Sequence, residues 1–174
     1  MTVYVDATAL VALGQVGELD LLTAFDGSPV VPEAVRAEVT TEPARTNLER
    51  FLDERDVAGG TGSDWTERAM RVLDAGSAES DVRVLAGILA SATDDGEGAN
   101  GSTVGLVSDD RRLRTVAEGF GATVTGTFGV VVRAAREDKY LPVSQAKRIV
   151  RRIDSHGLHL TGEMREQAVG ETES

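Results

Sequence analysis

The chain of 174 residues contains no cysteine, which excludes disulfide bonds and thiolate zinc sites. Histidine is almost as scarce: His156 and His159 lie close together near the C-terminus. They form a metal-site candidate, although surface histidines beside a helix end are the interpretation that we favour. With no cysteine and no nucleophilic serine–histidine pair, water remains as the nucleophile for any hydrolytic chemistry.

Long hydrophobic runs are also missing. No apolar stretch approaches the length needed to span a bilayer, so we expect no membrane association. The first residues, Met1 to Asp6, carry no basic region and reach an acidic residue at once, which is not typical of a signal peptide. We therefore expect a cytoplasmic protein. An apolar fraction of 41% over 174 residues is ordinary for one domain with a proper core.

Lysine is rare in this acidic chain. Of the 18 basic residues only Lys139 and Lys147 are lysines, and the net charge is −11. We interpret this composition as a halophilic signature. A strongly acidic chain binds nucleic acid poorly without specific contacts, because that affinity comes from neutralised phosphates. Molar salt nevertheless screens charges beyond roughly 3 Å, so a nucleic-acid substrate stays open if a local basic patch or a metal ion attracts it.

Apolar runs and helical patterns alternate along the chain. Strands are expected at 2–6, 29–31, 104–107 and 122–125, with a further edge strand at 56–58. Helical periodicity is expected between them, including a second early helix at 18–25, and the polar stretch 93–103 is expected to be a surface loop. Two more helices are expected at 144–153 and 161–169. This order predicts an α/β fold with a parallel sheet of four to five strands flanked by helices.

Four acidic sites occupy informative positions in this pattern. Asp6 ends the first apolar run and the pair Asp109–Asp110 ends a later one, whereas Glu38 and Asp81 lie within helical patterns. Carboxylates at the C-terminal ends of parallel strands converge in the crevice where open α/β sheets bind ligands. Unpaired carboxylates repel one another unless a hard cation such as Mg²⁺ or Mn²⁺ lies among them. The pattern therefore raises the question of whether these four sites converge around a metal ion.

Four segments resemble the motifs of PIN domains. They are Val5 to Leu13 followed by Val31 to Val39, the run Val107 to Ala117, and the segment Gly121 to Val130. The last is similar to a Gly-Thr-Leu-Gly-Val segment in a PIN-like subgroup related to the toxin nucleases of toxin–antitoxin pairs. The resemblance covers about residues 2–142. It implies a three-layer PIN-like domain at 1–142, with residues 143–174 as a C-terminal helical extension.

The resemblance implies a metal-dependent ribonuclease with Mg²⁺ or Mn²⁺ as cofactor and RNA as substrate. It also suggests an antitoxin protein and a second copy of the chain as partners. The residues that match the acidic motifs, which are implied to be catalytic or metal-binding, are Asp6, Glu38, Asp81 and one of Asp109 and Asp110. Thr8 and Ser108 match supporting hydroxyl positions. Glu79 stands where the subgroup has another acid, so it is a rival to Asp81, which we favour.

Plainer interpretations stay open for each of these residues. Asp6, Asp81 and the Asp109–Asp110 pair can each cap or face a helix N-terminus, and Glu38 can be a solvated surface residue. After the acidic pair come Arg111, Arg112 and Arg114, and a later helix carries Arg148, Arg151 and Arg152. We predict RNA contacts for Arg111, Arg112, Arg148 and Arg151; salt bridges within this acidic chain are the alternative.

Two rival functions remain. A strand that ends in aspartate also opens haloacid-dehalogenase-type phosphatases, but that pattern needs a second aspartate where Thr8 stands, and the chain lacks a cap-sized insertion. The other rival is a non-catalytic PIN-fold protein that binds RNA or a protein partner, which sequence alone does not separate from the nuclease.

Overall fold

The computed structural model describes residues 1–23, 27–55, 57–59, 63–77, 79–94, 104–136 and 141–155. Its centre is a sheet of four strands, all parallel, in the order β2-β1-β3-β4. The strands are β1 (Thr2–Val5), β2 (Ser28–Val30), β3 (Val104–Val107) and β4 (Thr123–Thr125). The predicted α/β class and the predicted parallel sheet are confirmed.

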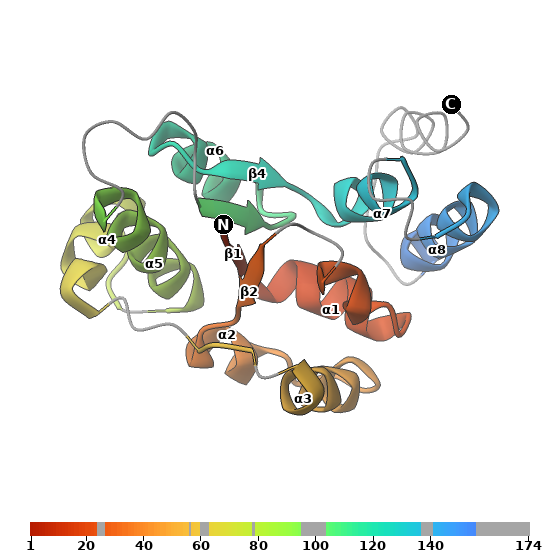
Figure 1. Ribbon diagram of the computed structural model, residues 1–174. Helices are drawn as coiled ribbons and strands as arrows, with labels where there is room; N and C mark the ends of the chain where they lie inside the picture. The colour runs from red at the N-terminus through yellow and green to blue at the C-terminus, as the bar shows by residue number, and fades with distance from the viewer. Residues whose placement is uncertain are drawn as a thin grey trace.

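The helices of the described segments surround this sheet. The α-helices are α1 (Ala7–Gln15), α2 (Glu33–Glu38), α3 (Ala44–Arg55), α4 (Thr66–Leu73), α5 (Ser80–Asp94), α6 (Arg111–Gly119), α7 (Thr127–Arg136) and α8 (Val143–Ser155). Two short 3-10 helices, η1 (Leu19–Thr23) and η2 (Ser63–Trp65), complete the set. In Figure 1, α4 and α5 lie on one side of the sheet, and α1, α7 and α8 lie on the other.

Each face of the sheet packs against a helix through a glycine. On one face, Gly87 of α5 lies against the ring of Tyr4, and a Cβ at this glycine would overlap the ring. On the other face, Gly129 of α7 lies against the side chain of Thr125. Because side chains alternate along a strand, Tyr4 faces α5 while Val3 and Val5 face the opposite layer. The result is the three-layer arrangement expected of a PIN-like domain.

Parallel strands give the sheet two unlike edges. The helices α1, α6 and α7 begin within a few residues of the ends of β1, β3 and β4, so their N-termini gather at the carboxyl edge. Helix N-termini carry partial positive charge and unsatisfied N–H groups, which favour carboxylates there. The 3-10 helix η1 follows α1 and precedes β2, which places it toward the opposite, amino edge of the sheet.

Three local expectations need correction. The predicted helix at 18–25 is a 3-10 helix at Leu19–Thr23 within the described residues, because Leu19, Leu21 and Leu22 all become buried in a tight turn. The predicted edge strand at 56–58 is only a single parallel bridge between Val30 and Ala58. The loop expected at 93–103 begins later than predicted, because α5 continues to Asp94. Residues 95–103, the helix expected at 161–169 and both histidines lie outside the described residues, so those predictions are not tested.

Helix α8 belongs to the same packed body as the layers before it. It contacts α7 and α1, and Ala146, Ile149, Val150 and Ile153 form its buried stripe. Their spacing is that of an amphipathic helix with one apolar face. Across the segments that the structure describes, no helix has the length and apolar character needed to cross a membrane.

Candidate active site at the carboxyl edge of the sheet

Asp6 follows β1 directly and is only 6% exposed. Its Oδ1 accepts hydrogen bonds from the Thr8 hydroxyl at 2.7 Å and from the Ala9 backbone N–H at 3.1 Å. Its Oδ2 accepts a 2.5 Å hydrogen bond from the Ser108 hydroxyl. The bond to Ala9 makes Asp6 the N-cap of α1. The residue is therefore both a helix cap and the centre of a buried polar cluster.

Burial raises the pKa of the Asp6 carboxyl above its ordinary value, because desolvation disfavours the charged form. Hydrogen bonds from Ser108, Thr8 and Ala9 act in the opposite direction, and repulsion from the carboxylate of Asp109 adds to the increase. A capping aspartate on the protein surface stays hydrated, so its charged form is not disfavoured in this way. A bound cation would offset the desolvation of Asp6, since a positive charge beside the carboxylate favours ionisation.

Two hydroxyl groups connect Asp6 to the residues after β3. The Thr8 hydroxyl accepts a hydrogen bond from the backbone N–H of Asp109 at 3.0 Å, and the Ser108 hydroxyl accepts one from the N–H of Asp110 at 3.0 Å. Each hydroxyl has one proton, which it donates to Asp6. These bonds fix the turn after β3 against the end of β1. The supporting hydroxyl positions that the family resemblance implied thus lie beside Asp6.

Asp109 faces the start of α7. Its Oδ1 accepts a hydrogen bond from the backbone N–H of Thr127 at 2.8 Å, and its Oδ2 accepts one from the Thr127 hydroxyl at 2.5 Å. Thr127 is completely buried, so this contact holds the carboxylate in one orientation. Asp109 therefore serves as a cap for α7 although it lies 18 residues earlier in the chain.

Asp110 has a different role from its neighbour. It is exposed, and its Oδ1 accepts a hydrogen bond from the backbone N–H of Leu113 at 3.1 Å, which makes it the N-cap of α6. From the sequence, we expected either Asp109 or Asp110 to cap a helix. The structure assigns the α6 cap to Asp110, because β3 ends at Val107, the hydroxyl of Ser108 turns inward to Asp6, and the helix begins only at Arg111.

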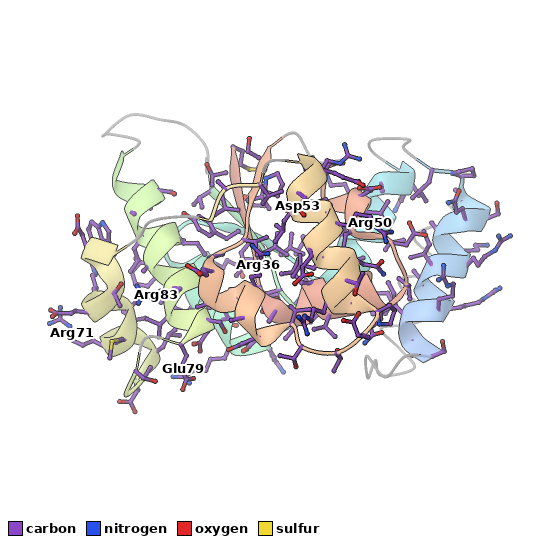
Figure 2. The ribbon with its side chains drawn as sticks, turned by 90° about the horizontal axis from the view of Figure 1, so that it is seen from below. Arg36, Arg50, Asp53, Arg71, Glu79 and Arg83 are labelled. Atoms are coloured by element: carbon purple, nitrogen blue, oxygen red, sulfur yellow. The ribbon has the colours of Figure 1, made fainter. Side chains whose placement is uncertain are left out.

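Asp81 and Glu79 differ in burial. Asp81, the second residue of α5, is half-buried, and its Oδ1 accepts a hydrogen bond from the N–H of Val82 at 2.9 Å. Glu79 precedes the helix, is exposed, and accepts a hydrogen bond from the Ser77 hydroxyl at 3.2 Å. Figure 2 shows Glu79 at the outer margin of the molecule. These positions favour Asp81 over Glu79 as the more inward acid.

Glu38 is the last residue of α2 and is exposed. Helix α2 packs against α5, the helix that carries Asp81, and begins two residues after Val31, beyond the end of β2. Within the described part of the chain, the Glu38 carboxylate makes no hydrogen bond or ion pair. Its proposed place in the site therefore rests on the family resemblance and stays a prediction.

The structure brings Asp6 and Asp109 together, but no three acidic or histidine side chains among the described residues lie close enough to hold a metal ion jointly. Two carboxylates are sufficient for Mg²⁺, which keeps several waters and binds through one or two carboxylates together with substrate phosphates. A carboxylate offers about four acceptor positions. Asp6 uses three and Asp109 uses two. The free positions fit a partly hydrated divalent cation.

The arginines predicted to bind RNA fall into two groups. Arg112 donates a hydrogen bond to the carbonyl of Leu73 at the end of α4, so it ties α6 to α4, whereas Arg111 is exposed. Arg148 and Arg151 are exposed on α8. Their neighbour Arg152 binds the carbonyl of Val16 beyond the far end of α1, away from Asp6. RNA contacts at these residues remain a prediction.

Two residues of the site were missed by the sequence analysis. They are Thr127, which holds Asp109, and Gly126 before it, where a Cβ would lie 2.9 Å from Oδ1 of Asp109. Both belong to the segment Gly121 to Val130, which was used only as a family signature. A glycine followed by threonine at a helix start was the available signal, but it does not identify the carboxylate that the threonine contacts.

Comparison with known families gives one result. The sequence matches the family model of DUF3368, whose description is PIN domain, over residues 2–174. Searches of curated proteins and of solved structures found no match. The match extends through α8 and beyond the region covered by the motif resemblance.

Proposed function

Since the chain belongs to DUF3368, a family of PIN domains, we propose that it is a metal-dependent ribonuclease that hydrolyses phosphodiester bonds of RNA. PIN domains are generally nucleases, commonly bind nucleic acids and typically use divalent metals. The single observation that carries the proposal is the buried Asp6 carboxylate, which the Thr8 and Ser108 hydroxyls join to the turn bearing Asp109.

Asp6 and Asp109 are the residues that we propose to hold the metal ion. A bound Mg²⁺ or Mn²⁺ would activate water, polarise the phosphoryl oxygen and neutralise the leaving oxygen. Thr8 and Ser108 orient Asp6, and Thr127 orients Asp109. Asp81 and Glu38 are proposed as further acids around the same centre. Asp110 is assigned to capping α6 rather than to metal binding.

One observation favours the non-catalytic alternative, a PIN-fold regulator that binds RNA or protein. Asp6, Asp109 and Asp110 each accept a hydrogen bond from an N–H in the first turn of a helix, so each has a structural role without any metal. The burial of Asp6 supports the nuclease over the regulator. A cap needs no burial, whereas Asp6 is almost completely buried at an energetic cost that capping alone does not explain.

The test is cleavage of a labelled single-stranded RNA by the purified protein in molar salt, with Mg²⁺, Mn²⁺ or EDTA. We expect cleavage with either metal, none with EDTA, and a loss of at least about 100-fold in Asp6→Asn, whose fold is checked by circular dichroism. Calorimetric titration with Mn²⁺ should show binding to the wild type and much weaker binding to Asp6→Asn. A wild-type protein that neither cleaves RNA nor binds Mn²⁺ would leave the regulator as the better function.

The resemblance to toxin nucleases adds a biological setting, in which the protein is the toxin of a toxin–antitoxin pair. Expression of the wild type alone should arrest growth of a host cell, and expression of Asp6→Asn should not. Co-expression of the protein encoded by the neighbouring reading frame should restore growth. Arrest that is equal for the wild type and for Asp6→Asn would contradict a toxin that acts through its nuclease site.

A further inference from the structure

We propose that Arg114 binds a phosphate of the RNA strand at the metal site, an inference that rests on the proposed nuclease function. The residue lies in the first half of α6, four positions after the cap Asp110. Long side chains on a helix point back toward its N-terminus. The Arg114 side chain follows this rule, so its guanidinium lies near the turn from β4 to α7.

The position of the guanidinium follows from the space around Gly126. A Cβ at this glycine would lie 3.4 Å from Nη1 of Arg114 and 2.9 Å from Oδ1 of Asp109. The cation and the proposed metal-binding carboxylate therefore border the same small volume. Glycine leaves this volume open, and the carbonyl of Ser108, 3.7 Å from the same point, also borders it.

Arg114 is half-buried, yet within the described residues its guanidinium makes no ion pair and donates no hydrogen bond. The carboxylate of Asp109, which borders the same volume, is engaged by the backbone and hydroxyl of Thr127 instead. The N-termini of α6 and α7 carry partial positive charge, which disfavours a cation beside them. Neither pairing with another described residue nor the helix dipoles therefore account for an arginine at this point.

An external anion would account for it. Guanidinium groups present five donors in a planar fork that matches phosphate oxygens. The phosphate of a strand held at Asp6 and Asp109 would lie within the reach of this fork. Arg112 is unsuited to the role because it binds the carbonyl of Leu73, and Arg111 is exposed at the first residue of the helix.

The experiment compares Arg114→Gln and Arg114→Lys with Arg50→Gln. Arg50 is also an arginine on a helix, but it lies on α3 beside Gly17 and Asp20, near the opposite edge of the sheet (Figure 2). Binding of a fluorescent single-stranded RNA is measured by anisotropy in EDTA over a series of salt concentrations. Mn²⁺ affinity is measured by calorimetry, and thermal unfolding confirms that each variant is folded.

We expect Arg114→Gln to bind RNA about tenfold more weakly than the wild type. The slope of log affinity against log salt should fall by about 0.7, the loss of one phosphate contact on a single strand. Arg114→Lys should recover part of the affinity, and Mn²⁺ affinity should stay unchanged. Arg50→Gln should match the wild type in every measurement.

Three results would overturn the assignment. The first is RNA affinity in Arg114→Gln equal to that of Arg50→Gln, and the second is a wild type that binds no RNA. The third is unchanged RNA affinity with weakened Mn²⁺ binding, which would make Arg114 a positioning residue for Asp109. RNA binding without any metal-dependent cleavage would instead contradict the proposed nuclease activity, while the anisotropy data would still decide the role of Arg114.

Discussion

At the carboxyl edge of the sheet, Asp6 is 6% exposed and accepts three hydrogen bonds, whereas near the amino edge Asp20 is exposed and pairs with Arg55 across 3.2 Å. Both are aspartates with hydrogen-bonded carboxylates. Asp6 is desolvated, and this burial raises its pKa, whereas the carboxylate of Asp20 remains exposed to solvent. Proteins keep desolvated charge mainly at functional sites, because it costs stability.

Acidic residues therefore have two different roles in this protein, one on the surface and one in the interior. The exposed carboxylates belong to a solvated surface, consistent with a net charge of −11. The buried carboxylate of Asp6 accepts hydrogen bonds from the hydroxyls of Thr8 and Ser108, and both hydroxyls also accept a hydrogen bond from a backbone N–H. This network fixes the orientation of each hydroxyl, which solubility does not require. Substitutions at the two edges should therefore differ in their effects on cleavage and on stability.

The largest effect should separate Asp109 from Asp110. Asp109→Asn retains an acceptor for the Thr127 N–H but loses the charge, so we expect cleavage to fall by about 100-fold or more. Asp110→Asn retains the α6 cap, because asparagine caps as well as aspartate does, and should stay within about threefold of the wild type. Initial cleavage rates with saturating Mn²⁺ provide the measurement.

Asp110→Ala gives the matching stability control. Loss of the cap should lower the free energy of unfolding by about 1 kcal/mol, measured by urea denaturation, with little effect on cleavage. Equal loss of cleavage in Asp109→Asn and Asp110→Asn would show that the two neighbours share the metal, against the assignment made from their contacts.

A smaller effect is expected at Gly126. In Gly126→Ala the new Cβ would lie 2.9 Å from Oδ1 of Asp109, too close for an undisturbed contact, so the carboxylate must shift. We expect cleavage to fall by about tenfold, because displacement of a positioned group by a fraction of an ångström is costly in an active site. Gly119→Ala is the matched control, since nothing lies within 4 Å of a Cβ there. Wild-type cleavage in Gly126→Ala would mean that the orientation of Asp109 is unimportant.

The pH dependence of stability tests the buried charge itself. The Asp6 carboxyl has a raised pKa in the folded state, so its protonated form stabilises the fold. That stabilisation is fully present below the ordinary value of 3.8 and is lost as pH rises through the higher folded pKa. In EDTA, Asp6→Asn should therefore gain stability relative to the wild type as pH rises, and the difference should level off once the Asp6 carboxyl is fully ionised.

Urea denaturation of both proteins at several pH values and one salt concentration measures this difference. The pKa of the Glu18 carboxyl is also raised, mainly by burial, but Glu18 is present in both proteins, so the subtraction removes it. Addition of Mn²⁺ should reverse the trend by stabilising only the wild type. A difference that does not change with pH would show that Asp6 is not strained by its burial.

Much of this arrangement follows from local sequence patterns. Alternation of apolar runs with helical periodicity indicates the parallel sheet, and an aspartate directly after the first apolar run lies at the carboxyl edge by construction. The supporting hydroxyls of Thr8 and Ser108 were also located, although through a family resemblance rather than through geometry.

Other features depend on contacts between distant segments. Which neighbour caps α6 depends on the inward rotation of Ser108 toward Asp6, a contact across 102 positions. The bond between Thr127 and Asp109 requires that β4 lie beside β3 in its observed register. Leucines at 19, 21 and 22 suit a helix face as well as a buried 3-10 turn, and only packing decides between them.

The smallest effect should come from the amino edge. Asp20→Asn removes an ion pair whose side chains are 58% and 43% exposed, so the free energy of unfolding should change by less than about 0.5 kcal/mol. Cleavage should be unchanged, because the pair lies near the opposite edge from Asp6. Molar salt should reduce the effect further by screening, and urea denaturation at low and high salt measures it. A loss well above 1 kcal/mol, or reduced cleavage, would mean that charge at this edge also does more than keep the surface hydrated.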